Sequence, residues 1–154
     1  MSGRIRLWLV LYQERLPSGL RLSIVILWAA LLWILSSRPG SGDPGGWLRG
    51  IVWNSGHIVA FGVLAGLIML SLQGNIVVRF RLAVAGSVFY GAVDEFHQGC
   101  VPGRAMDIWD LCSDGLGAAL FGCGIWWLLT GNRRPRAWLL PLAFLGLCSV
   151  SMAA

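Results

Sequence analysis

Long apolar stretches alternate with short polar segments along most of the chain. An α-helix rises about 1.5 Å per residue, so about 20 residues cross the roughly 30 Å hydrocarbon core of a bilayer. Five stretches approach that length, at about residues 20–36, 55–72, 82–97, 108–130 and 137–153. We therefore predict an all-α fold, a polytopic transmembrane helical bundle of about five spans that occupies residues 1–154 as a single domain.

The segment at residues 4–16, RIRLWLVLYQERL, precedes the first of these stretches. Its apolar centre is too short to cross a bilayer, and basic residues flank it on both sides. Helices of this kind lie in the membrane interface, so we predict a short N-terminal interfacial helix. A cleaved signal peptide is disfavoured because no small-residue cleavage pattern follows a suitable apolar run.

The third stretch is the shortest. Only about a dozen apolar residues separate Arg81 from Asp94, and as a helix they cover about 18 Å. A helix anchored at the inner interface by Arg79 and Arg81 would bring Asp94 and Glu95 out below the outer interface. We therefore expect these two carboxylates at membrane depth, followed by a turn at residues 101–103 and a short re-entrant or interfacial connection.

Small residues recur at helical spacing in the second and fourth stretches. Such residues let helix backbones approach closely in a membrane. The pattern favours packing surfaces inside the bundle over a dedicated dimerisation motif. The residues are Gly62 and Gly66 in the second stretch and Gly115, Gly117, Ala118, Ala119 and Gly122 in the fourth.

Composition and charge support a membrane location. Hydrophobic residues make up 56% of the chain and charged residues only 12%. All 12 basic residues are arginine, which does not resemble a nucleic-acid-binding surface, and we expect no nucleic-acid partner. With the N-terminus cytoplasmic, nine arginines lie in or near inner loops and three in outer loops, which follows the positive-inside rule. We therefore predict a cytoplasmic N-terminus and an extracytoplasmic C-terminus.

Residues 94–114, DEFHQGCVPGRAMDIWDLCSD, hold five of the seven carboxylates, one of the two histidines and an arginine. Ionised groups are costly near hydrocarbon unless they are paired, hydrated or bound to a ligand. This segment lies between two predicted spans. It is therefore the first candidate for a functional site.

Helical spacing predicts where these side chains point. Asp110 and Asp114 share one stripe of the fourth span with Asp107 at its start, and His57 lies near the outer end of the second span. On the third span a stripe at helical spacing is formed by Tyr90, Asp94, His97 and Gln98, with Glu95 beside it. We expect three helices to aim these groups into one cavity that opens outward.

Charge balance leaves three alternatives open. One arginine and two histidines cannot neutralise five ionised carboxylates, so either some carboxylates are protonated, or a divalent metal is bound, or a cationic ligand is bound. Arg104 is equally compatible with a structural ion pair to Asp107 or Asp110 and with a fork that grips a phosphate or carboxylate. For Asp107, capping of the fourth span is favoured over chemistry.

Two blocks of sequence resemble a known family. DEFHQGCVPGR, followed by Asp110, Asp114 and Gly117, is similar to the signature of the VanZ-like membrane proteins, and NSGHIVAFGVLAGL resembles that family's other recurring block. Together they define a motif core at residues 54–122. The family often has a lysine three residues before its histidine, where this chain has Asn54. The matching motif positions are His57, Glu95, His97, Gln98, Pro102, Gly103, Arg104, Asp110 and Asp114.

The resemblance implies a multi-pass protein of the bacterial inner membrane. The family takes its name from an accessory protein of glycopeptide-resistance clusters that is associated with low-level teicoplanin tolerance. Family membership does not define the chemistry. Membrane lipids are the expected partners, together with a lipid-linked cell-wall precursor or a lipoglycopeptide.

Two functional hypotheses follow. The first is a protein whose outward cavity binds a cell-envelope amphiphile, such as a lipid head group, a cell-wall precursor or a lipoglycopeptide, and so contributes to glycopeptide tolerance. The substrate-binding candidates are His57, Asp94, Glu95, His97, Gln98, Arg104, Asp110 and Asp114. A proton-coupled transporter is disfavoured, since no internal repeat is evident.

The alternative is an intramembrane, metal-assisted hydrolase or transferase that acts on a lipid-linked head group. Glu95 or His57 would be its catalytic base. The candidate ligands for a divalent metal are Glu95, Asp110 and Asp114.

Overall fold

The computed structural model describes residues 2–40 and 47–131. Within them it contains five helices and no strand: α1 (Ser2–Arg15), α2 (Ser18–Ser36), α3 (Trp47–Ser71), α4 (Ile76–Gln98) and α5 (Ile108–Thr130). The all-α fold is therefore confirmed. The predicted span at 137–153 lies outside the described residues.

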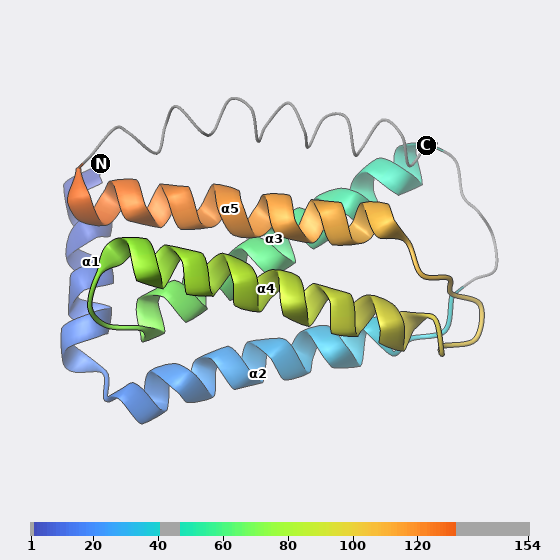
Figure 1. Ribbon diagram of the computed structural model, residues 1–154, viewed down its shortest axis with the longest axis horizontal. Helices are drawn as coiled ribbons and strands as arrows, with labels where there is room; N and C mark the ends of the chain where they lie inside the picture. Colours follow the sequence, from blue (N-terminus) through green and yellow to red (C-terminus); the bar gives the residue numbers. More distant parts are fainter. Residues whose placement is uncertain (1, 41–46, 132–154) are drawn as a thin grey trace.

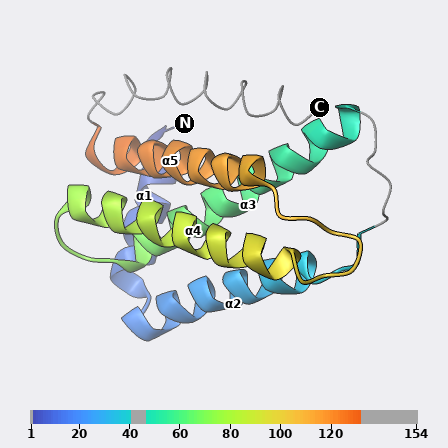
Figure 2. The same ribbon diagram turned by 45° about the vertical axis from the view of Figure 1, so that its right-hand side comes forward.

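Helices α2, α4 and α5 run along the long axis of the molecule, α3 passes obliquely behind α4 and α5, and α1 lies across one end of this bundle (Figure 1). This is the end at which α3 and α5 terminate and α2 and α4 begin. The view in Figure 2 shows the same crossing arrangement of α1. A helix across the end of a bundle is the arrangement expected for the predicted interfacial segment.

Three helices are long and apolar enough to cross a membrane, namely α2, α4 and α5, and α3 contributes a shorter apolar segment at Ser55–Ser71. Large apolar side chains are exposed along the bundle, among them Leu27, Phe89 and Phe96, each at least 69% exposed. Side chains of this kind suit hydrocarbon rather than water. The chain is therefore a membrane protein.

Helix α4 is longer than the apolar pattern indicated. It begins at Ile76, where the Asn75 side chain accepts a hydrogen bond from the Val77 backbone at 2.8 Å, and it runs for 23 residues. Arg79, treated above as an anchor in the inner interface, is 8% exposed. Its Nε and Nη2 donate to the carbonyl oxygen of Met69 at 3.0 and 2.8 Å.

A second buried arginine lies at the same end of the bundle. Arg21 is 1% exposed and donates from Nη1 to the carbonyl oxygen of Gln13 at 3.2 Å, and Gln13 donates to that of Leu70 at 3.1 Å. The last carbonyls of a helix lack partners within it and attract positive charge. Arg21 and Arg79 therefore join α1, α2 and α4 to the end of α3, a role that the apolar pattern did not reveal.

The glycines of α3 and α5 mediate close helix packing, as predicted. A Cβ atom added at Gly117 would collide with the backbone carbonyl of Ile58 on α3, and one added at Gly62 would collide with the ring of Phe121 on α5. Gly66 similarly faces Ile125. The close approach of these two helices brings the α3 histidine next to the carboxylates of α5.

Candidate functional site

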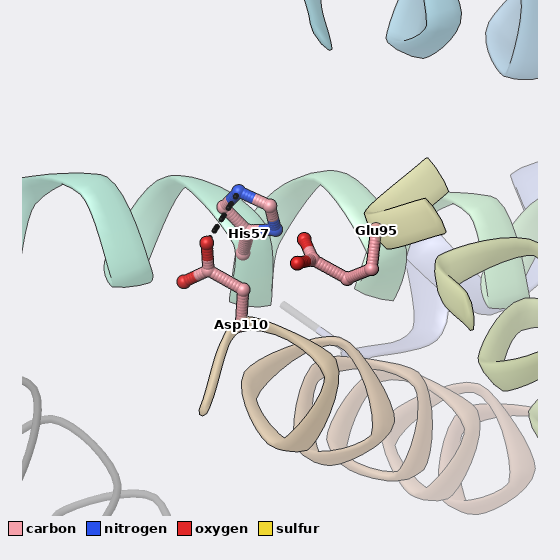
Figure 3. A group of neighbouring side chains, drawn as sticks. All are labelled: His57, Glu95 and Asp110. Atoms are coloured by element: carbon pink, nitrogen blue, oxygen red, sulfur yellow. Dashed lines mark ion pairs between the residues drawn. The ribbon is translucent and has the colours of Figure 1, made fainter. Parts of the chain in front are cut away.

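Three helices contribute side chains to one polar group at the end of the bundle opposite α1. His57 comes from α3, Glu95 from α4 and Asp110 from α5, and the three side chains point toward one another (Figure 3). One ligand atom from each lies within 4.8 Å of the other two. Glu95 and Asp110 are buried, at 6% and 9% exposure. We call these three residues with Asp114 the polar centre.

Asp114 fixes the ring of His57. The distance from His57 Nδ1 to Asp114 Oδ1 is 2.9 Å, and Asp114 is 1% exposed. An ionised carboxylate has no proton to donate, so Nδ1 carries the hydrogen and donates it to Asp114. The other ring nitrogen, Nε2, lies 3.8 Å from Oδ2 of Asp110. Asp110 and Asp114 can meet one imidazole because they are four positions apart on a single helix and so lie on the same face.

Glu95 links the end of α4 to the start of α5. Its Oε2 accepts a hydrogen bond from the backbone N–H of Asp107 at 2.8 Å, and its Oε1 accepts one from Gln98 Nε2 at 3.2 Å. The Asp107 side chain accepts from the backbone N–H of Trp109 at 2.8 Å. The expectation that Asp107 caps its helix is thereby confirmed.

A glycine makes room for Asp114 on the neighbouring helix. A Cβ atom at Gly91 would lie 2.6 Å from Asp114 Oδ2. That oxygen is buried and has no hydrogen-bond partner among residues 2–40 and 47–131. The polar centre therefore contains a buried carboxylate oxygen whose hydrogen-bonding capacity is unused by the described residues, which is costly unless another group compensates.

Several of the candidates from α4 point elsewhere, toward α2. Asp94 accepts from Ser36 Oγ at 2.6 Å and from Gln98 Nε2 at 2.8 Å. His97 stacks on Trp33, with ring centroids 3.9 Å apart, and its Nε2 is hydrogen-bonded to Ser37 Oγ at 2.9 Å.

Tyr90 belongs to the same face, because its hydroxyl donates to the Ala29 carbonyl of α2 at 2.6 Å. The stripe formed by Tyr90, Asp94 and His97 thus packs against α2. The polar centre uses the adjacent face of α4, which carries Gly91 and Glu95.

Arg104 lies in the connection between α4 and α5 and is half-buried. It donates from Nη1 to Gln98 Oε1 at 2.6 Å and from Nε to the carbonyl oxygen of Arg38 at 3.1 Å. The Gly40 backbone N–H donates to the Pro102 carbonyl in the same region. Arg104 and Gln98 therefore connect the segment after α2 to the polar centre through Glu95.

The motif positions that the resemblance singled out are thus partly gathered in space: the histidine of one block and three carboxylates of the other meet in the polar centre. A family model described as VanZ/LLP1 matches residues 22–130 of the chain. The chain belongs to the VanZ/LLP1 family. The predicted motif core at 54–122 lies inside the matched region. Searches of curated proteins and of solved structures found no match.

Two residues of this region were missed in the sequence. Ser36 binds Asp94, and Gly91 leaves space for Asp114. The sequence contained two signals: a serine at the end of an apolar helix, and a glycine one turn before paired carboxylates. Neither signal identifies a site residue unless the helix that lies opposite is known.

The chemistry of the polar centre is dominated by acceptor atoms. Glu95, Asp110 and Asp114 supply carboxylate oxygens, and His57 Nε2 is free of the Asp114 hydrogen bond. Such a group can accept hydrogen bonds from hydroxyls or amines, or bind a cation. Both outcomes would offset the cost of gathering carboxylates inside a membrane protein.

Proposed function

We propose that this VanZ/LLP1 family member is a bacterial inner-membrane protein that binds the polar head group of a cell-envelope amphiphile at the polar centre. The observation that carries the proposal is the meeting of His57, Glu95 and Asp110 from three different helices. Nothing in the packing of apolar helices requires such a group, and burying it is costly. A bound ligand gives a reason for that cost.

Access to the polar centre supports the proposal. The side chains of His57 and Asp110 keep 13% and 12% exposure, whereas Asp114 behind them has 1%. His57 and Asp110 are therefore the groups that a head group would touch first. The distribution of arginines along the chain predicts that this end of the bundle faces the extracytoplasmic side.

The chemistry suits envelope amphiphiles. Carboxylates of the polar centre and His57 Nε2 accept hydrogen bonds from hydroxyls or amines of a sugar, glycerol or peptide head group, while Arg104 engages anionic groups. A lipid head group, a lipid-linked cell-wall precursor and a lipoglycopeptide all present such groups at the outer leaflet. If the protein bound any of these molecules, it would alter the interaction of teicoplanin with the cell envelope.

Comparison of the two histidines provides the test. The full chain, reconstituted in nanodiscs, is assayed by native mass spectrometry against phosphatidylglycerol, a lipid-linked cell-wall precursor and teicoplanin, with phosphatidylcholine as the background. We expect His57→Ala to weaken retention of the preferred ligand about tenfold or more, because it removes one polar contact to the head group and the partner that holds Asp114. The matched variant His97→Ala should stay within about twofold, since His97 faces α2.

Two outcomes would contradict the proposal. One is retention of none of the three ligands above the background. The other is an equal loss in His57→Ala and His97→Ala, because it would mean that binding does not take place at the polar centre.

A further inference from the structure

We infer that His57, Glu95 and Asp110 form a binding site for a divalent first-row transition-metal cation, with Asp114 as the residue that holds the imidazole in its ligating orientation. The ligand set differs from the one predicted from the sequence. There the candidates were Glu95, Asp110 and Asp114; here His57 takes the place of Asp114, which lies behind the ring.

The first argument is the orientation of His57. Histidines that bind metals donate their other ring N–H to a carboxylate or carbonyl, which fixes the tautomer and the ring plane. Asp114 provides this carboxylate at 2.9 Å from Nδ1. In the neutral ring that donates from Nδ1 to Asp114, the lone pair is on Nε2, which faces Asp110.

The second argument is the spacing between donor atoms. His57 Nε2 and Asp110 Oδ2 are both electron-pair donors in this state, and they face each other at 3.8 Å. That distance is too long for a hydrogen bond. Two atoms that each lie about 2.1 Å from one cation are about 3 to 4 Å apart. The three donor atoms lie within 4.8 Å of one another, so a small side-chain rotation would bring them to the spacing that one cation requires.

The third argument is the gathering of buried carboxylates. Asp114 is 1% exposed, its Oδ1 is bonded to His57, and its Oδ2 has no hydrogen-bond partner in the part of the chain that the structure describes. Together with Glu95 and Asp110, it gives three carboxylates around one imidazole. A divalent cation placed between Nε2 and the two ligand carboxylates would compensate the negative charge of these groups in their ionised forms.

The donor set also indicates the class of cation. One imidazole nitrogen with two carboxylates suits Zn²⁺ or Mn²⁺, because Ca²⁺ and Mg²⁺ take oxygen ligands almost exclusively. Three protein ligands leave a coordination position open. An anionic oxygen of a head group, such as a phosphate or carboxylate oxygen, would complete the shell. This last step rests on the proposed function, whereas the cation site itself does not.

The test uses the purified full chain in nanodiscs after removal of metal with a chelator. Uptake of Zn²⁺, Mn²⁺ and Ca²⁺ is measured by calorimetry and by elemental analysis after gel filtration. We expect one Zn²⁺ or Mn²⁺ per chain and at least tenfold weaker binding of Ca²⁺. No stoichiometric uptake of Zn²⁺ or Mn²⁺, or equal uptake of Ca²⁺, would overturn the inference.

Variants separate ligands from neighbours. Asp110→Asn keeps the shape of the side chain and should weaken Zn²⁺ uptake about 100-fold, while Asp114→Asn should weaken it about 10- to 100-fold, the usual effect of losing an outer carboxylate. Asp107→Asn is the charge-matched control, since it also removes one negative charge, retains a good capping side chain and should change uptake less than about threefold.

Two further measurements exclude trivial explanations. Replacement of Zn²⁺ by Co²⁺ should give visible absorption bands that shift in Asp114→Asn, which a purely structural role of Asp114 would not produce. Helical content and gel-filtration profile show whether each variant folds. If Asp110→Asn folds and still binds Zn²⁺ like the wild type, the proposed ligand set is wrong.

Failure of the cation site and failure of the proposed function give different results. Retention of the amphiphile by metal-free protein in chelator would refute the bridging step and leave head-group binding intact. Stoichiometric Zn²⁺ uptake without retention of any amphiphile would refute the proposed function and leave the cation site intact.

Discussion

Two adjacent carboxylates on α4 face different helices. Asp94 faces α2 and accepts short hydrogen bonds from Ser36 and Gln98 on its two oxygens. Glu95 faces α3 and α5, and shares its surroundings with His57 and Asp110. The hydrogen bonds of Asp94 complete a tie between two helices. Glu95 instead belongs to a group in which acceptor atoms exceed donors.

The comparison shows that burial alone does not identify a functional acid. Asp94 and Glu95 are 3% and 6% exposed, so exposure does not distinguish them. Their partners do. Both oxygens of each carboxylate accept a hydrogen bond, but Glu95 also lies beside a second carboxylate and an imidazole. A like charge nearby makes an ionised carboxylate costly, so a cation or a further donor stabilises Glu95 more than Asp94.

The largest effect is expected from a substitution that separates α3 from α5. In Gly117→Val the new side chain meets the backbone carbonyl of Ile58, which cannot rotate away. We expect a loss of about 1–3 kcal/mol in stability and loss of Zn²⁺ and head-group binding, because His57 moves away from Asp114. The apparent unfolding temperature and ligand retention are measured together.

Gly124→Val is the matched control for that variant, since no atom of another described element lies within 4 Å of a Cβ added at Gly124. It should retain both stability and binding. Equal damage in the two variants would mean that valine itself, rather than the close approach of α3 and α5, disturbs α5.

The carboxylate pair itself gives the second prediction. Asp94→Asn and Glu95→Gln each convert one acceptor oxygen to an amide, so both should lower stability by a similar amount, about 1 kcal/mol. Binding should separate them: Glu95→Gln loses about tenfold or more in Zn²⁺ affinity, and Asp94→Asn less than about twofold. Zn²⁺ affinity is measured by calorimetry and stability by thermal unfolding. Equal losses of Zn²⁺ affinity in the two variants would contradict the different roles of Asp94 and Glu95.

The smallest expected effect concerns two glycines of α4. Alanine is a better helix former than glycine by about 0.5–1 kcal/mol. In Gly86→Ala the new Cβ is at 3.6 Å from Ile68, an ordinary contact, so this variant should be as stable as the wild type or slightly more so. In Gly91→Ala the Cβ displaces Asp114, so the gain should vanish and Zn²⁺ binding should weaken severalfold.

Measurement of unfolding temperature and Zn²⁺ affinity in both glycine variants sharpens the comparison of the two faces. If Gly91→Ala binds Zn²⁺ like Gly86→Ala, the position of Asp114 does not control the orientation of His57.

Much of the fold could be predicted from hydrophobic periodicity. The span predicted at 108–130 coincides with α5, and the one at 20–36 begins two residues after Ser18, the start of α2. Helices α3 and α4 begin earlier than predicted. At α4 the reason is Arg79, which lies inside the helix and bonds to the end of α3. In the sequence, a charged residue at this position indicates the end of an apolar stretch, so the predicted span began after it.

The membership of the polar centre could be predicted only in part. The spacing of Asp110 and Asp114 places both on one face of a helix whatever the fold, and their contact with one histidine agrees with it. On α4, spacing grouped Tyr90, Asp94 and His97 correctly as a face. It could not indicate that this face meets α2.

Hydrophobicity, arginine placement and helical spacing are local properties, so the chain carries them before it folds; they suffice for an all-α membrane protein with polar groups concentrated near one end. Which carboxylate meets the imidazole depends on the rotation of each helix about its axis. That rotation is set by contacts between distant residues, such as Gly117 with Ile58 and Gly91 with Asp114. Glu95 therefore belongs to the polar centre, and its neighbour Asp94 does not, because of how three helices pack.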